Sequence, residues 1–207
     1  MAATFLTLLS TPNELMQRIG DILTRDAMHV EPKKVSMTYA SVLVIIHYHD
    51  ATPHIILTKR STSVRLHGGE ICFPGGRYDP VEDKNLLDTA IRETNEELGL
   101  VLNTADIIGR LQPVKTLTSN FIIYPFVTIK LTVASPKSLS AEVEKVIDVP
   151  LYRVLDSITP DLRYPNLSSK SPLYKFKFKE DIVWGATSRI LKQLYDCLYR
   201  KSCKIDL

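Results

Sequence analysis

The sequence predicts an α/β domain in which a mixed β-sheet lies between helices. One observation is the run of apolar and β-branched residues at positions 40–48, which is typical of a strand buried on both faces. A second is the order of segments along the chain, which alternates as helix, strands, helix, strands, helix. A third is size, because 207 residues, of which 44% are hydrophobic, can bury the core of one sizeable domain.

The first predicted helix begins at Thr11. Thr11 supplies a hydroxyl cap, Pro12 fits the first helical position, and Glu14 stands three residues after the cap. An apolar stripe then continues the helix to about Thr24. Because residues 31–34 (Glu-Pro-Lys-Lys) interrupt this pattern, we expect an N-terminal helical extension at residues 1–35 and the main domain at residues 36–201.

The remaining elements follow from turn residues and periodicity. After the buried strand, a turn at residues 50–53 leads to a returning strand at 54–59. Residues 60–76 are polar and glycine-rich, which predicts a long loop that leads into a helix at about 85–98. Further strands are expected at residues 107–113, 121–133 and 173–178 and before Pro150, and a closing helix at 182–199.

Charge and cysteine content exclude several classes of protein. The net charge of +3, with scattered basic residues, does not indicate a nucleic-acid partner. The chain has no apolar run of about 18 residues, so we expect no membrane span. Three cysteines without metal-site spacing favour a reducing compartment, which is the cytoplasm. The oligomeric state does not follow from the sequence.

The helix at 85–98 carries the chemistry. Glu93, Glu96 and Glu97 stand at i, i+3 and i+4, so three carboxylates share one helical face. Like charges at this spacing cost on the order of 0.2–0.5 kcal/mol per pair, and Arg92 can relieve Glu96 four residues on. Bound Mg²⁺ or Mn²⁺ would remove the rest of the repulsion. A solvated acidic face is an equally good interpretation of this helix alone.

The opposite face of the same helix is apolar, and it predicts how the helix docks. Gly99 is suited to end the helix in a left-handed conformation. The residues expected to face the core are Leu87, Ala90, Ile91, Thr94 and Leu98.

The residues at 73–76 (Phe-Pro-Gly-Gly) and the segment 92–100 together resemble the Nudix box. The resemblance implies the Nudix fold, an α/β/α sandwich with a mixed β-sheet, and metal-dependent hydrolysis of a nucleoside diphosphate linked to another group. The spacing between Gly76 and Arg92 is two residues longer than in the usual box. Glu82 and Asp83 are therefore both candidates for the first glutamate of the box, and Lys84 occupies its regular position.

The residues directly upstream resemble the extra motif of the coenzyme A pyrophosphatase subgroup of Nudix enzymes. The motif comprises positions 56–61, Arg65 and the Gly-Glu pair at 69–70. The resemblance implies a small-molecule substrate, coenzyme A, cleaved to 3′,5′-ADP and 4′-phosphopantetheine. It also implies candidate substrate-binding residues, which are Lys59, Arg60, Ser61, Arg65 and Gly75. Alternatively, these charges are solvated, or Arg60 pairs with a carboxylate such as Glu70.

Two later segments also resemble this subgroup. Glu142 lies in a segment similar to its late acidic segment, which makes Glu142 a fourth acidic group, as a metal ligand or a base. A surface carboxylate beside Lys145 is an equally good interpretation of Glu142. Residues 184–187 (Trp-Gly-Ala-Thr) resemble the start of the subgroup's closing helix, and we assign them to packing.

The resemblance implies a role for each residue of the box. Glu93, Glu96 and Glu97, helped by the Gly76 carbonyl, would bind one to three Mg²⁺ or Mn²⁺ ions. Glu93 or Glu142 would accept the proton of the attacking water, and Arg92 would orient a glutamate. Three rival hypotheses stay open: a Nudix hydrolase of NADH, ADP-ribose or capped RNA, a Nudix-fold module that binds a nucleotide without cleaving it, and a coincidentally acidic helix.

Overall fold

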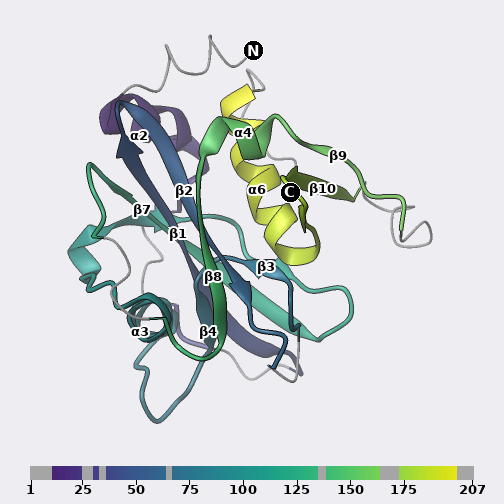
Figure 1. Ribbon diagram of the computed structural model, residues 1–207. Helices are drawn as coiled ribbons and strands as arrows, with labels where there is room; N and C mark the ends of the chain where they lie inside the picture. The colour runs from purple at the N-terminus through teal and green to yellow at the C-terminus, as the bar shows by residue number, and fades with distance from the viewer. Residues whose placement is uncertain are drawn as a thin grey trace.

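A computed structural model of the protein describes residues 11–24, 30–32, 36–63, 67–134, 139–163 and 173–199. Its centre is an eight-stranded mixed sheet, with helix α3 on one face and helices α2, α4 and α6 on the other (Figure 1). The predicted α/β class, with a mixed sheet between helices, is confirmed. None of the helices that the structure describes combines the length and hydrophobicity needed to cross a bilayer.

Strand β1 (Thr38–His49) is the central strand of the sheet. It runs parallel to β7 (Phe121–Lys130) and antiparallel to β2 (Thr52–Arg60). Its side chains alternate between two apolar clusters, with Val44 on one face and Ile45 on the other. Burial on both faces explains why the predicted strand is continuously apolar rather than alternating.

The shorter strands extend or flank this sheet. Strands β3 and β8 pair with β2, β4 pairs with β1, and β5 and β6 pair with β7, while β9, β10 and β11 form a separate three-stranded sheet. Their bounds are β3 Ile71–Cys72, β4 Gly75–Arg77, β5 Ile107–Arg110, β6 Val114–Lys115, β8 Val143–Pro150, β9 Thr159–Pro160, β10 Tyr174–Phe178 and β11 Asp181–Val183.

The first described helix, α2 (Pro12–Ile19), starts as the sequence predicts. Thr11 and Glu14 form a capping box at its N-terminus. The α-helix ends earlier than the expected Thr24, because a 3₁₀ turn (Gly20–Ile22) follows it. Leu15 is fully buried in the same cluster as Val44. The boundary between an extension and a main domain stays a prediction.

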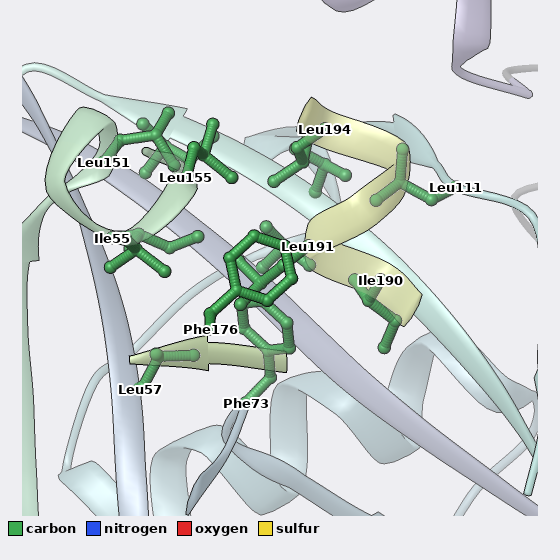
Figure 2. Packing of buried hydrophobic residues seen from close by; sticks show 14 of the residues in the cluster. Ile55, Leu57, Phe73, Leu111, Leu151, Leu155, Phe176, Ile190, Leu191 and Leu194 are labelled. Atoms are coloured by element: carbon green, nitrogen blue, oxygen red, sulfur yellow. The ribbon is translucent and has the colours of Figure 1, made fainter. Parts of the chain in front are cut away.

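Two apolar clusters fix the helices on the sheet. The larger cluster joins α2, α4 (Leu151–Leu155) and α6 (Gly185–Tyr199) to one face of the sheet. Figure 2 shows side chains of α4, α6, β2 and β10 pointing into this cluster, with Phe73 among them. The smaller cluster joins α3 (Leu86–Leu98) to the opposite face. A short 3₁₀ helix, η2 (Thr104–Asp106), precedes β5.

Several other predicted boundaries are wrong. Residues 60–76 are not all loop, because β3 and β4 lie within them and pair with β2 and β1. The closing helix starts at Gly185 rather than at residue 182, because residues 181–183 pair with β10 as strand β11. The strands expected at 107–113 and 121–133 end earlier, at Arg110 and Lys130.

Candidate active site

Helix α3 is held at both ends by its own sequence. Asn85 caps the N-terminus, where its side chain accepts hydrogen bonds from the backbone N–H groups of Leu87 and Asp88. Gly99 ends the helix in the left-handed conformation at φ 64°, as predicted. The predicted core-facing stripe is buried at Leu87, Ala90, Thr94 and Leu98 and half-buried at Ile91.

Strand β4 brings two glycines against α3 and β1. Gly75 and Gly76 pair with Val42 and Ser41 of β1. A Cβ atom at Gly75 would overlap the Ser41 carbonyl oxygen, and the residue has φ +143°. A Cβ atom at Gly76 would overlap the carboxylate of Glu93. Glycine is therefore required at Gly75, where the clash is with backbone, while at Gly76 a larger residue would displace the Glu93 carboxylate.

Glu97 lies beneath this glycine strand and is only 5% exposed. Its Oε2 accepts a hydrogen bond of 3.2 Å from the Gly75 backbone N–H. Burial raises the pKa of Glu97 to about 7, although that hydrogen bond and the charge of Arg60 act in the opposite direction. The sequence placed Glu97 on a shared acidic face, and the structure turns it inward.

Glu93 and Glu96 stay closer to solvent, with side chains 21% and 55% exposed. Burial raises the pKa of Glu93 in spite of the neighbouring Arg92 guanidinium. Arg92 Nη1 lies 3.2 Å from a Glu96 oxygen and 3.1 Å from a Glu93 oxygen. The predicted pairing of Arg92 with Glu96 is confirmed. The same guanidinium also pairs with Glu93, so it contacts two of the three box glutamates.

The other edge of the Arg92 guanidinium binds Asp83. Two hydrogen bonds of 2.8 and 2.9 Å join Arg92 Nε and Nη2 to the two Asp83 oxygens. Asp83 is buried, yet hydrogen bonds from Arg92, the Asp79 backbone and Thr89 keep the pKa of its carboxyl below the usual value. Of the two carboxylates that the sequence left open, Asp83 is therefore the one that fixes Arg92. Glu82 lies 3.5 Å from Arg92 Nε with an exposed side chain.

A pocket of about 480 Å³ opens beside the glycine strand. Gly75, Gly76, Arg60 and Glu142 contribute its polar edge. Residues 184–187, predicted to serve packing, do so at Ala186, which packs against the larger cluster, and they also form part of the pocket wall. The apolar wall comes from Ala40, Val42, Phe73, Leu117, Phe121, Ile123, Leu173, Tyr174, Trp184 and Ala186.

Arg60 and Glu142 pair across the edge of this pocket. Arg60 Nη2 donates to a Glu142 oxygen at 3.2 Å. The alternative pairing of Arg60 with Glu70 is wrong, because Glu70 lies 3.0 Å from His67 Nδ1. The Nε of Arg60 is buried without a hydrogen-bond partner among the described residues. Arg60 therefore keeps a buried donor at the polar edge of the pocket.

The predicted substrate-binding residues separate into two groups. Of those that the structure describes, Arg60 and Gly75 line the pocket, whereas Lys59 and Ser61 do not. Lys59 instead pairs with Glu144 and Asp181, at 3.4 and 3.5 Å. The Ser61 backbone N–H donates to the Glu142 carbonyl oxygen. Arg65 lies outside the described residues.

Comparison with known proteins identifies the family. The family model of the NUDIX domain matches residues 37–163, which include β4, α3 and the acidic site. The chain belongs to the Nudix family. It is 30% identical over 186 residues to "Uncharacterized Nudix hydrolase NudL" of Photorhabdus laumondii, covering 86% of this chain and 97% of the relative. The protein of the same name in Pectobacterium atrosepticum is 29% identical over 184 residues, covering 85% and 92%.

Solved structures support the Nudix fold independently. A NUDIX hydrolase from Alicyclobacillus acidocaldarius superposes with a TM-score of 0.55 at 18% identity, covering 82% of this chain and 96% of that one. A MutT/nudix family protein from Enterococcus faecalis gives 0.51 at 11% identity, covering 91% and 70%. With its complete acidic segment on α3, the protein is a Nudix hydrolase, an enzyme of nucleoside diphosphate derivatives.

Proposed function

We propose that this Nudix hydrolase cleaves the diphosphate bond of coenzyme A or its derivatives, giving 3′,5′-ADP and 4′-phosphopantetheine. One observation carries the proposal. The glycine strand β4 borders both the carboxylates of α3 and the pocket that holds Arg60 and Glu142. A diphosphate at β4 would have metal-binding oxygens on one side and the half-buried guanidinium of Arg60 on the other.

The acidic side chains fit a divalent cation. Burial raises the pKa of both Glu93 and Glu97, and neighbouring carboxylates add to it, Glu96 at Glu93 and Glu142 at Glu97. Arg92 is shared among Asp83, Glu93 and Glu96, so one guanidinium offsets several carboxylates. Hard cations such as Mg²⁺ and Mn²⁺ prefer carboxylate and carbonyl oxygens. Glu93, Glu96, Glu97 and the Gly76 carbonyl would hold the ion or ions.

The protein's own residues position the reaction. When bound, Mg²⁺ or Mn²⁺ supplies charge neutralisation at the diphosphate oxygens and makes a water molecule more acidic. Glu93 or Glu142 accepts the proton of the attacking water, and both act electrostatically on Glu97 from nearby. Arg92, anchored by Asp83, orients Glu93 and Glu96. Arg60, at the polar edge of the pocket, stabilises the negative charge on the phosphate.

The pocket supports a substrate with an anionic head and a long, mostly neutral arm. Its polar edge lies at Arg60 and Glu142, while Trp184, Tyr174 and Leu117 line its apolar wall. Coenzyme A has this division, because its diphosphate and 3′-phosphate adjoin a pantetheine arm. The motif upstream of the glycine strand, which resembles that of coenzyme A pyrophosphatases, supports the same substrate.

A substrate panel tests the proposal. Purified protein with Mn²⁺ is given coenzyme A, 3′-dephospho-coenzyme A, NADH and ADP-ribose, and the products are identified by mass. We expect the highest kcat/KM for coenzyme A, with 3′,5′-ADP and 4′-phosphopantetheine as products. Preference for NADH or ADP-ribose would replace the substrate and keep the enzyme class. No product from any compound would favour a nucleotide-binding module instead.

A further inference from the structure

A second group of metal-ligand side chains lies at the far end of the central strands from α3. His47 of β1 stands opposite His54 of β2, and Asp148 of β8 stands opposite Ile56, two residues further along β2. Cross-strand partners and second neighbours share one face of a sheet, so both imidazoles and the carboxylate lie on the same face. Their ligand atoms all lie within 4.8 Å of one another.

Asp148 already joins the two rings. Its Oδ1 lies 3.0 Å from His47 Nε2 and 2.9 Å from His54 Nδ1. The side chains of His47 and His54 are 10% and 14% exposed, whereas that of Asp148 is 48% exposed. The two ring nitrogens are therefore shielded, and the group opens to solvent beside the carboxylate.

These distances suit a tetrahedral ion. Ligand atoms about 2.1 Å from a tetrahedral zinc ion are about 3.4 Å apart. The Asp148 oxygen needs to move by only a few tenths of an ångström from each ring nitrogen to reach that spacing. Because the three ligand atoms come from neighbouring strands and already lie within 4.8 Å of one another, an ion would require little rearrangement of the backbone.

We propose that His47, His54 and Asp148 bind Zn²⁺ or a chemically similar first-row transition metal, at a site separate from the carboxylates of α3. Imidazole nitrogens favour zinc, copper and nickel, whereas sites made only of oxygens favour magnesium and manganese. Three protein ligands and one solvent position complete a four-coordinate shell. None of the three lines the pocket beside the glycine strand in the part of the chain that the structure describes.

The surroundings are compatible with a cation. His49 places a third imidazole beside the group, with its ring centroid 5.6 Å from that of His54. Three of the chain's five histidines thus gather at this end of the sheet. Lys130 of β7 stands opposite His47, but its ammonium is paired with Asp106. That positive charge is already compensated and does not repel an ion at full strength.

Such an ion would join strands β1, β2 and β8. The unfolded chain does not hold the three ligands together, so the metal binds the native state preferentially and raises its Tm. Strand β8 begins one residue after Glu142. The ion would therefore also fix the strand that follows Glu142 at the pocket.

Cobalt spectroscopy tests the site, because four-coordinate Co²⁺ absorbs visible light far more strongly than six-coordinate Co²⁺. Full-length protein is stripped with a chelator and titrated with Co²⁺ and then with Zn²⁺. The variants are His54→Gln and Asp148→Asn. His67→Gln serves as the matched control, since His67 pairs with a single carboxylate, and Glu96→Gln removes a ligand of the acidic site.

We expect one intense cobalt band per chain in the wild type, His67→Gln and Glu96→Gln proteins, displaced by Zn²⁺. His54→Gln and Asp148→Asn should lose the band and bind Zn²⁺ roughly tenfold or more weakly. An absent band in the wild type, or a band unchanged in both ligand variants, would overturn the proposal. Zinc-edge X-ray absorption of Glu96→Gln decides without a ligand variant: scattering from two imidazoles supports the site, and oxygen scattering alone refutes it.

Discussion

The two ends of strand β1 hold two polar groups of opposite character. Near its start, Ser41 and Val42 pair with the glycine strand that covers the carboxylates of Glu93 and Glu97. Near its end, His47 meets one carboxylate and a second imidazole. His47 lies six positions after Ser41, which corresponds to a distance of about 20 Å along the strand. The same central strand therefore adjoins a group of carboxylates near its start and a pair of imidazoles near its end.

The pKa values of the carboxyl groups at the two ends shift in opposite directions. Burial raises the pKa of Glu97 to about 7. At the other end, burial of Asp148 is outweighed by hydrogen bonds from His47 and His54, which lower its pKa. A cation bound at the acidic end would favour the ionised form of Glu97. At the histidine end, the hydrogen bonds from His47 and His54 already compensate Asp148, and a metal ion would bind there in exchange for protons.

The largest expected effect tests whether the acidic end is catalytic. Glu97→Gln keeps a side-chain oxygen for the Gly75 N–H but removes a metal-binding charge. We expect the variant to fold and its kcat to fall by about 10²–10⁴-fold. Steady-state hydrolysis with Mn²⁺ measures it, and Glu180→Gln, an exposed glutamate, should keep wild-type turnover. Near-normal turnover in Glu97→Gln would remove Glu97 from the mechanism.

A smaller effect is expected where Asp83 anchors the acidic helix. Asp83→Asn removes one charge of a buried, doubly hydrogen-bonded pair with Arg92. We expect the free energy of unfolding, measured with urea in chelator, to fall by about 2–3 kcal/mol. The matched control is Glu82→Gln, whose exposed side chain lies near the same guanidinium and should cost less than about 0.5 kcal/mol. Equal losses in both variants would contradict the anchoring role of Asp83.

The pH dependence of stability sharpens the difference between the two ends. Folding raises the pKa of Glu97 from 4.5 to about 7. The native state then binds the Glu97 proton more tightly than the unfolded state does. The stabilisation from this proton is complete below the unfolded pKa of 4.5 and is lost as the pH rises through the folded pKa of about 7. In chelator, the free energy of unfolding should fall between about pH 4.5 and 7, and fall less in Glu97→Gln. Parallel curves would mean that Glu97 ionises normally.

The smallest expected effect lies in the hairpin beside the histidine end. Asp50 and Ala51 both have positive φ, 47° and 58°, in the turn between β1 and β2. Glycine adopts this conformation without the steric cost of a Cβ atom. Ala51→Gly should therefore raise the free energy of unfolding by about 1 kcal/mol and leave turnover unchanged. A destabilised variant would show that the turn is not strained at Ala51.

The sequence predicted the parts of this fold that depend on local pattern. The capping box at Thr11, the buried strand β1, and Gly99 at the end of α3 all follow from residue type and spacing. Strands β4 and β11 did not, because two or three residues carry no periodicity and pair only through tertiary contacts. Short strands of this kind cannot be separated from loops by local propensity.

The site shows the same division between local and tertiary information. Spacing alone brought Glu93, Glu96 and Glu97 together, but it could not show that Glu97 is buried under a strand 22 residues earlier in the chain. It also could not choose between the adjacent Glu82 and Asp83 as partner of Arg92.

The histidine cluster was not found from the sequence at all. His47 and Asp148 are 101 positions apart. The one local signal was the hairpin, in which a two-residue turn at 50–51 sets His47 opposite His54. Nothing in the local pattern places Asp148 beside them.

The most direct test of the acidic site is a manganese-soaked crystal examined by anomalous diffraction. We expect an anomalous peak bounded by the side chains of Glu93, Glu96 and Glu97 and the Gly76 carbonyl. No peak along this face of α3, with Arg92 still holding Glu93 and Glu96 and Glu97 still bound only to the Gly75 N–H, would contradict it.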